Sequence, residues 1–274
     1  MVFALWLLFA FAVLLLIFAL YLWLIAPARR PYPGKFRRDV LYAHRGLHDG
    51  NHEVNENSMR AFALAAEKGY GMEMDLQSTR DGQVVVFHDA NTLRVCGADA
   101  EIGQTDYANL PHLPDGTPIP LFADFLKLVN GRVPVIIEFK HQKQYVQTAC
   151  AALALLKEYS GEYYLESFHP CIVRYLRMHA PGALRGQLSS GQFGKSTNAF
   201  TAFILKHLLI NVLSRPHFIA YDFSSDHSLS LKLNRKLFRP VFAAWTIRSQ
   251  ADLDAARSRY DMIMFEGFIP DSAR

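Results

Sequence analysis

Charged side chains are absent from the first 28 of the 274 residues, and residues 1–25 are almost entirely Leu, Phe, Ala, Val, Ile and Trp. An α-helix rises ~1.5 Å per residue, so this run is long enough to cross the ~30 Å hydrocarbon core of a bilayer. Ala26-Pro27-Ala28 resembles a signal-peptide cleavage site, but no basic residue precedes the run, which is also longer than a typical signal core. We expect a retained transmembrane anchor over residues 1–27, with a cleaved signal and a secreted product as the alternative.

Basic residues are missing before the apolar run and clustered after it, in a linker that we assign to residues 28–38. The positive-inside rule then predicts a single-pass protein of the cell membrane whose remaining domain is cytoplasmic. The same cluster can lie against anionic headgroups. Much of the formal net charge of +4 therefore reflects topology. No other basic patch with interleaved aromatic residues occurs, so nucleic acid is not an expected partner. The cluster consists of Arg29, Arg30, Lys35, Arg37 and Arg38.

Cysteine is scarce. The three residues Cys96, Cys150 and Cys171 are odd in number and far apart. Such spacing makes neither a zinc-binding pattern nor a disulfide framework, and it is typical of reduced thiols in a cytosolic domain. The sequence gives no indication of the oligomeric state.

After the linker, short apolar runs alternate with longer helical segments over residues 39–274. Eight strands with helices between them predict an α/β fold in which a parallel sheet closes into a (β/α)8 TIM barrel. The expected strands are Val40–Ala43, Met72–Leu76, Val133–Phe139, Tyr163–Ser167, Leu184–Leu188, Phe218–Asp222, Val241–Thr246 and Met262–Glu266. The expected helices are Ser58–Lys68, Leu121–Val129, Gln144–Tyr159, Pro170–His179, Asn198–Leu213, Ser228–Phe238 and Ser249–Ser258. Few residues follow the last strand, so the eighth helix is expected to be short or missing.

Two segments depart from a plain barrel. Arg80-Asp81-Gly82 followed by Val84–His88 predicts a tight turn and an extra strand. Residues 90–120 are polar and poor in helical pattern, which predicts a small insertion after the second strand. Insertions at the active face of a barrel commonly determine substrate choice.

Three carboxylates lie on expected strands. Glu73 and Asp75 alternate with apolar residues, and Glu138 ends a nearly continuous apolar run. In a barrel of parallel strands such groups meet at the carboxyl ends, where their oxygens suit one divalent ion such as Mg²⁺ or Ca²⁺. The plainer interpretation of Glu73 and Asp75 is a surface strand with a solvated face, and that of Glu138 with Lys140 is an ion pair at a strand exit.

Two histidines also end expected strands, His44 beside Arg45 and His88 after a Val-rich run. Imidazoles are the usual proton-transfer groups near neutral pH, so the pair favours acid–base catalysis. Arg45 and Lys140 are the groups expected to neutralise a phosphate. The remaining histidines are interpreted as surface or loop residues, although His141 directly follows Lys140: His48, His52, His112, His141, His169, His179, His207, His217 and His227.

These strand ends belong to an ordered series of short motifs. The series is His44-Arg45-Gly46, Glu56-Asn57-Ser58, Ala61-Phe62, Ala65, Gly69, Glu73-Met74-Asp75, Thr79-Arg80-Asp81-Gly82, Val85-Val86-Phe87-His88-Asp89, Ile119-Pro120-Leu121, Ile137-Glu138-Phe139-Lys140, Ser167-Phe168 and Ala244-Trp245-Thr246. It resembles the signature of the glycerophosphodiester phosphodiesterase family and covers essentially Leu41 to Thr246. No single tripeptide is specific, but the ordered set is.

The resemblance implies a TIM barrel with a small insertion after strand two. It also implies that Glu73, Asp75 and Glu138 hold a divalent metal and that His44 and His88 act as general acid and base. By the same resemblance Arg45 binds phosphate oxygens, with help from Lys140. Family members usually carry a Thr-Asp pair soon after the last strand, where this chain has Phe265-Glu266. The role of Glu266 therefore stays open.

The predicted function is hydrolysis of a glycerophosphodiester to a phosphomonoester, such as glycerol 3-phosphate, and an alcohol. The nucleophile is either water or the neighbouring glycerol hydroxyl, which would act by way of a cyclic phosphate. One alternative is a membrane-tethered lysophospholipase D-like hydrolase, for which the apolar segment Leu205–Leu213 would dip into the membrane interface instead of packing as an ordinary barrel helix. The other is a non-catalytic, membrane-bound phosphodiester-binding protein.

Overall fold

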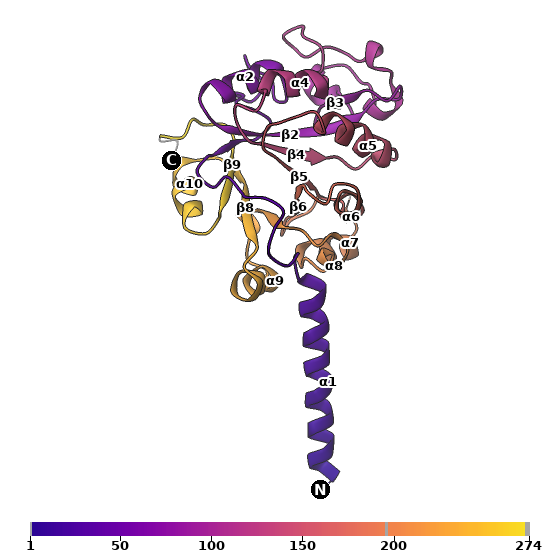
Figure 1. The fold of residues 1–274 in the computed structure, drawn as a ribbon, viewed down its shortest axis with the longest axis vertical. Helices are drawn as coiled ribbons and strands as arrows, with labels where there is room; N and C mark the ends of the chain where they lie inside the picture. The colour runs from indigo at the N-terminus through magenta and orange to yellow at the C-terminus, as the bar shows by residue number, and fades with distance from the viewer. Residues whose placement is uncertain (1, 195–196, 272–274) are drawn as a thin grey trace.

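The computed structural model describes residues 2–194 and 197–271, which form a barrel with one long helix extending from it (Figure 1). Eight parallel strands close the barrel because β1 pairs with β2 on one side and with β9 on the other. The strands are β1 Tyr42–Ala43, β2 Gly71–Ser78, β4 Val135–Phe139, β5 Tyr163–Ser167, β6 Leu184–Ser189, β7 Phe218–Asp222, β8 Val241–Ile247 and β9 Met262–Phe265. The predicted (β/α)8 barrel is confirmed.

Helices cover the outside of the barrel. They are α2 Met59–Glu67, α4 Phe122–Val129, α5 Tyr145–Leu156, α6 Pro170–His179, α7 Ala199–Lys206, α8 Asn211–Ser214, α9 Leu229–Leu233 and α10 Gln250–Arg257. Ser58 caps α2 by accepting a hydrogen bond from the Ala61 N–H, as expected for a helix with a serine at its N-cap. No helix follows β9 within the described part of the chain.

Two predicted helices are interrupted. The helix expected over Asn198–Leu213 divides into α7 and α8, because Leu208 takes the left-handed conformation (φ 55°) and is completely buried. The helix expected over Ser228–Phe238 changes after α9 into a π-helical turn, η4, over Asn234–Phe238. In both cases the apolar spacing predicts one continuous helix, whereas the structure has an interruption at a completely buried residue, Leu208 or Asn234.

The extra strand β3, Val84–Val86, lies antiparallel on β2. The stretch after it contains only short elements: α3 Leu93–Cys96 and the 3-10 turns η1 Ile102–Gln104 and η2 Tyr107–Asn109. Val85 and Phe87 anchor these turns on a small apolar core of their own. This stretch corresponds to the predicted insertion.

The linker closes the amino-terminal end of the barrel. The Phe36 ring stacks on Tyr164 with centroids 5.3 Å apart and lies edge-on to Phe218 at 5.6 Å. A Cβ atom at Gly186 would overlap the Phe218 ring, so only glycine fits there. These aromatic rings fill the amino-terminal end, so an open site for a substrate is expected at the opposite, carboxyl end of the strands.

Helix α1, Val2–Ile25, leaves the body as a single straight rod (Figure 1). It is long and apolar enough to cross a membrane, and none of its most apolar 18-residue window is buried in the protein. The boundaries predicted at residues 27 and 38 stay predictions.

Candidate active site

Glu73, Asp75 and Glu138 meet at the carboxyl end of neighbouring strands. In the parallel register of β2 and β4, Asp75 lies opposite Glu138, and Glu73 lies two residues earlier on the same face. One carboxylate oxygen from each residue lies within 4.8 Å of the others. All three side chains are buried, so the interpretation of Glu73 and Asp75 as a solvated surface strand is wrong.

Lys140 supplies a positive charge to this cluster. Its Nζ lies 2.9 Å from Asp75 Oδ1 and 2.9 Å from Glu138 Oε1. Burial lowers the pKa of Lys140, but the two carboxylates raise it above its ordinary value, so the ammonium stays charged. The predicted Glu138–Lys140 ion pair is therefore present, but it is part of the acidic cluster.

Arg45 reaches the cluster because the chain turns sharply after β1. Arg45 and Gly46 both have left-handed φ values, 57° and 80°. This conformation points the Arg45 backbone N–H at Glu73 Oε2, at 3.0 Å. Its guanidinium lies 3.5 Å from Asp75 Oδ2 through Nε and donates from Nη1 to Glu56 Oε1 at 2.9 Å.

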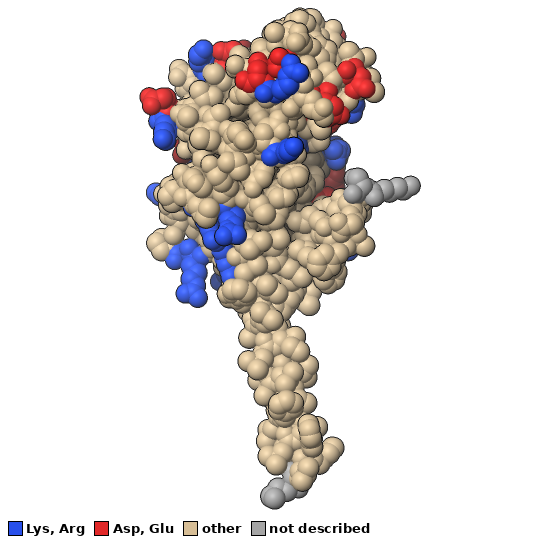
Figure 2. Space-filling view, turned by 90° about the vertical axis from the view of Figure 1, so that its right-hand side faces the viewer, with Lys and Arg blue, Asp and Glu red and all other residues tan. Residues whose placement is uncertain are grey.

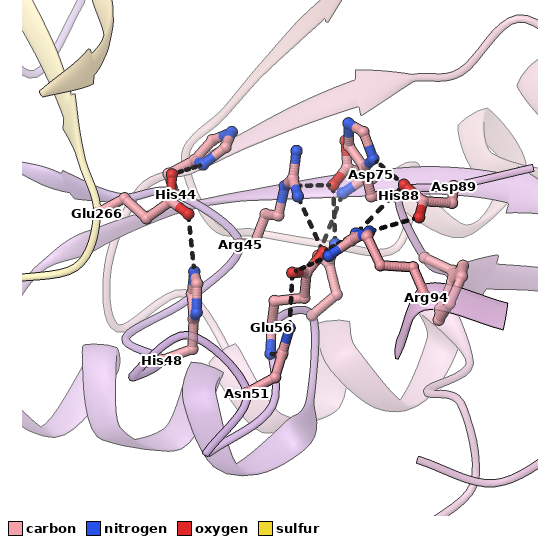
Figure 3. Close-up of polar contacts among 12 residues, drawn as sticks. His44, Arg45, His48, Asn51, Glu56, Asp75, His88, Asp89, Arg94 and Glu266 are labelled. Carbon is pink, nitrogen blue, oxygen red and sulfur yellow. Dashed lines mark hydrogen bonds and ion pairs between the residues drawn. The ribbon is translucent and has the colours of Figure 1, made fainter. Parts of the chain in front are cut away.

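Asn57 and Glu56 hold this arrangement from the loop before α2. The Asn57 amide donates to Asp75 Oδ2 at 2.8 Å in a buried hydrogen bond. Glu56 accepts from Arg45 and from both terminal nitrogens of Arg94, at 2.9 and 2.7 Å (Figure 3). The sequence places Asn57 in the motif Glu56-Asn57-Ser58, but its neighbours in the chain do not indicate a contact with Asp75.

His44 lies on one side of Arg45 and Asp75, and His88 lies on the other (Figure 3). The Nε2 atom of His44 is 3.8 Å from Glu73 Oε2, and its Nδ1 is 3.1 Å from Glu266 Oε2. Burial lowers the pKa of His44 to about 4, although the hydrogen bond to Glu266 raises it in part. His44 is therefore neutral at neutral pH, with one ring nitrogen able to accept a proton.

The His88 side chain is more exposed than that of His44, and it is held by the carboxylate of the next residue, Asp89. Its Nδ1 lies 2.6 Å from Asp89 Oδ1, and Arg94 in turn contacts Asp89 Oδ2 at 2.6 Å. The carboxylate fixes the orientation of the ring. His88 also helps to lower the pKa of Asp75: burial raises that pKa, but Lys140 and then His88 outweigh burial.

Two of the histidines predicted to be surface or loop residues lie in loops but are buried, His48 and His217. His48 lies in a loop, is 8% exposed and has its Nε2 3.7 Å from Glu266 Oε1, which places it beside the site. His217 is also buried, but it contacts Arg185 at the other end of the barrel. His141 stacks on His169 with ring centroids 4.1 Å apart. No sequence signal distinguishes His48, because its partner Glu266 lies at the far end of the chain.

Glu266 comes directly after β9 and contacts His44, His48 and Arg248. Burial raises its pKa, but the hydrogen bond from His44 and the nearby positive charges lower the pKa to about 2. Glu266 is therefore ionised at neutral pH and orients the His44 ring.

The acidic cluster fits a divalent cation. Its donor atoms are all carboxylate oxygens, which are the ligands of Mg²⁺ and Ca²⁺. Burial and the negative charges of Asp75 and Glu138 hold the pKa of Glu73 well above its ordinary value. Burial of three carboxylates together raises the pKa in this way, and a bound divalent cation would stabilise their ionised forms. Glu73, Asp75 and Glu138 are the residues that would hold the ion.

The sequence matches the glycerophosphoryl diester phosphodiesterase family over residues 44–271. The chain belongs to this family, whose name denotes phosphoric diester hydrolases, so the predicted family membership is confirmed. Fold comparison agrees. A phosphodiesterase of Oleispira antarctica, solved with sn-glycerol-3-phosphate, superposes with a TM-score of 0.67 at 20% identity, over 82% of this chain and 92% of that one. The Thermotoga maritima glycerophosphodiester phosphodiesterase gives 0.63 at 22% identity, over 85% and 96%.

Sequence relatives carry two kinds of name. Lysophospholipase D GDPD3 of Homo sapiens is 42% identical over 72 residues, 26% of this chain and 22% of that protein. Glycerophosphodiester phosphodiesterase of Bacillus altitudinis is 31% identical over 110 residues, 36% of this chain and 44% of that protein. The matches thus span about a fifth to under half of these relatives.

Proposed function

We propose that this protein hydrolyses glycerophosphodiesters to a phosphomonoester, such as glycerol 3-phosphate, and a free alcohol. The observation that carries the proposal is the arrangement of His44 and His88 on opposite sides of Arg45 and Asp75 (Figure 3), where Asp75 belongs to the buried carboxylate cluster that Lys140 also contacts. Family membership supports the reaction class, and this geometry supports a role for one histidine in proton transfer on each side of the bound phosphodiester.

In the proposed reaction the phosphorus–oxygen bond to the leaving alcohol breaks as a new bond forms to the nucleophile. If the nucleophile is water, the phosphomonoester forms directly. If it is the adjacent glycerol hydroxyl, a cyclic phosphate forms first, and water then breaks one of its ring phosphorus–oxygen bonds to give the phosphomonoester. One histidine takes the proton of the nucleophile, and the other gives a proton to the departing alkoxide. Arg45 and Lys140 bind the phosphoryl oxygens, and Glu266 orients His44. A divalent cation held by Glu73, Asp75 and Glu138 would stabilise negative charge in the transition state.

We further propose that α1 is retained as a single membrane span and that the barrel lies in the cytoplasm. The support is the length and apolar composition of Val2–Ile25 and the basic residues that follow it. N-terminal sequencing of the protein purified from membranes tests retention, and cleavage after Ala28 would refute it.

A release assay tests the function. The full chain, purified in a mild detergent, is incubated with glycerophosphocholine, glycerophosphoethanolamine and glycerophosphoglycerol in Mg²⁺ or in Ca²⁺, and glycerol 3-phosphate is measured enzymatically. We expect release from at least one diester with at least one metal. Binding of a diester by calorimetry without any release would instead support the non-catalytic phosphodiester-binding protein.

A second substrate class is favoured by one surface feature. Phe200 and Phe203 on α7 are 73% and 54% exposed, and α7 lies next to α8, which packs on the end of α1 (Figure 1). Rings in this position would enter the interfacial layer of a membrane that α1 spans. Turnover of a lysophospholipid presented in vesicles is the corresponding activity.

Replacing both rings, as Phe200→Ser with Phe203→Ser, separates the two substrate classes. We expect the double variant to lose roughly tenfold or more of its rate on lysophosphatidylcholine in vesicles, because the apolar contact with the interface is lost. The rate on soluble glycerophosphocholine should not change. Leu93→Ser is a matched control, since this 55% exposed residue belongs to the insertion on the far side of the barrel from α1. Equal rates for wild type and double variant on vesicles would exclude this role for α7.

A further inference from the structure

The end of α1 is attached to the barrel by side-chain hydrogen bonds. The carbonyl oxygens of the last helical turn have no partner inside a helix and need other donors. Asn211 and Asn234 both donate to the Ile25 oxygen, at 2.9 and 3.2 Å. Arg215 Nη1 donates to the oxygens of Trp23 and Ala26, at 2.9 and 2.7 Å. The helix therefore meets the barrel at a fixed, capped joint.

A pocket of about 880 Å³ lies at this joint, between the last turn of α1, the start of the linker and η4. One part of its wall is apolar and continues the surface of α1, and another part is cationic. The apolar part includes Leu22, Trp23 and Leu237, and the cationic part consists of Arg29, Arg30 and Arg215.

None of these three arginines makes an ion pair with a carboxylate among the described residues. Arg30 donates to the Arg239 backbone oxygen and lies over the Tyr32 ring, and Arg215 lies over the Trp23 ring. Further positive charge surrounds them. Burial, then the charges of Arg177 and Arg29, lower the pKa of Arg215. Figure 2 shows the same excess of positive charge: Lys and Arg lie on the body near its junction with α1, and most Asp and Glu lie farther from α1.

We propose that this pocket binds the headgroup of an anionic phospholipid from the leaflet in which α1 ends. The phosphate would lie among Arg29, Arg30 and Arg215, and an acyl chain would lie along Leu22 and Trp23. The inference rests on the proposed membrane span and is independent of the catalytic site, which lies at the carboxyl end of the strands.

Two observations favour a lipid over a free phosphate. Pro216, whose backbone oxygen accepts from the Ala28 N–H, lies two residues before the start of β7, so the pocket lies at the amino-terminal end of the barrel and level with the end of the span. That is the depth of lipid headgroups. The apolar wall around Trp23 would contribute nothing to the binding of inorganic phosphate, but it fits the glycerol backbone and upper acyl chain of a lipid.

Lipid binding to the intact chain tests the proposal. The full chain in a neutral detergent is titrated with phosphatidylglycerol or with phosphatidylcholine, and bound lipid is counted by native mass spectrometry. We expect phosphatidylglycerol to bind at least about tenfold more tightly. The double variant Arg29→Gln with Arg30→Gln should weaken phosphatidylglycerol binding by roughly ten- to thirtyfold and leave phosphatidylcholine unchanged. Arg215 is left intact because it caps α1.

Lys68→Gln with Lys127→Gln is the matched control, since it removes two charges from α2 and α4 on the side of the barrel opposite α1. It should bind phosphatidylglycerol as the wild type does. Equal affinity for both lipids, or an unchanged preference in the arginine variant, would overturn the proposal. Displacement of phosphatidylglycerol by millimolar inorganic phosphate, or an intact mass lacking residues 1–28, would overturn it too. Release of glycerol 3-phosphate from glycerophosphocholine is measured on the same samples. That rate reports on the proposed function and should be equal in all of them.

Discussion

Chelation of divalent cations should reduce diester hydrolysis by roughly 10³-fold or more, and Mg²⁺ or Ca²⁺ should restore it. The reason lies in the cluster of Glu73, Asp75 and Glu138. One oxygen from each of these buried carboxylates lies within 4.8 Å of the others, and a divalent cation bound there would neutralise them and attract the anionic phosphodiester. The measurement is glycerol 3-phosphate release after dialysis against EDTA and after addition of each metal. Full activity in the dialysed, metal-free protein would refute the metal assignment.

Neutral replacements in the same cluster should reproduce this loss. Glu73→Gln, Asp75→Asn and Glu138→Gln each remove one charged ligand, and we expect no recovery of activity at metal concentrations that saturate the wild type. Glu162→Gln is a matched control because that side chain is 54% exposed. Thermal unfolding provides a second measurement. Added metal should raise the melting temperature of the wild type and of the control, but not that of the Asp75 variant.

Replacement of either histidine should lower turnover by about 10²–10⁴-fold, the usual contribution of a general acid or base. His44→Gln and His88→Gln keep the ring volume in part and retain a hydrogen-bonding group, so folding and the metal-induced rise in melting temperature should persist. His227→Gln serves as the control, since that side chain is 84% exposed. Wild-type rates in either site variant would remove that residue from the mechanism.

A diester with a 4-nitrophenolate leaving group assigns the two roles. This leaving group departs without protonation, so the variant that lacks the general acid should hydrolyse it at nearly the wild-type rate. The variant that lacks the general base should stay slow on both kinds of substrate. If both variants hydrolyse the 4-nitrophenyl diester at the wild-type rate, neither histidine acts as the general base.

Much of the barrel is predictable from local pattern. The apolar run of β4 ends in Glu138, and the alternation in β2 places Glu73 and Asp75 on one face, because side chains alternate along a strand. Parallel strands bring their carboxyl ends together, so the acidic cluster follows from the expected fold. The two interrupted helices were not predictable in this way. The turn at Leu208 and the π-helical turn over Asn234–Phe238 contain buried residues, and their contacts are made with distant parts of the chain that local spacing does not reveal.

The sequence by itself determined which residue types end each strand, and hence the family and the polar groups of the site. Only the tertiary structure decided which of these groups touch. His44 and Glu266 are 222 residues apart along the chain, and Asn57 reaches Asp75 from a loop whose neighbours indicate only a helix cap. The joint between α1 and Arg215 is a contact of the same kind. Local sequence patterns report the periodicity of single elements, whereas closure of the barrel selects the partners of each side chain from distant elements.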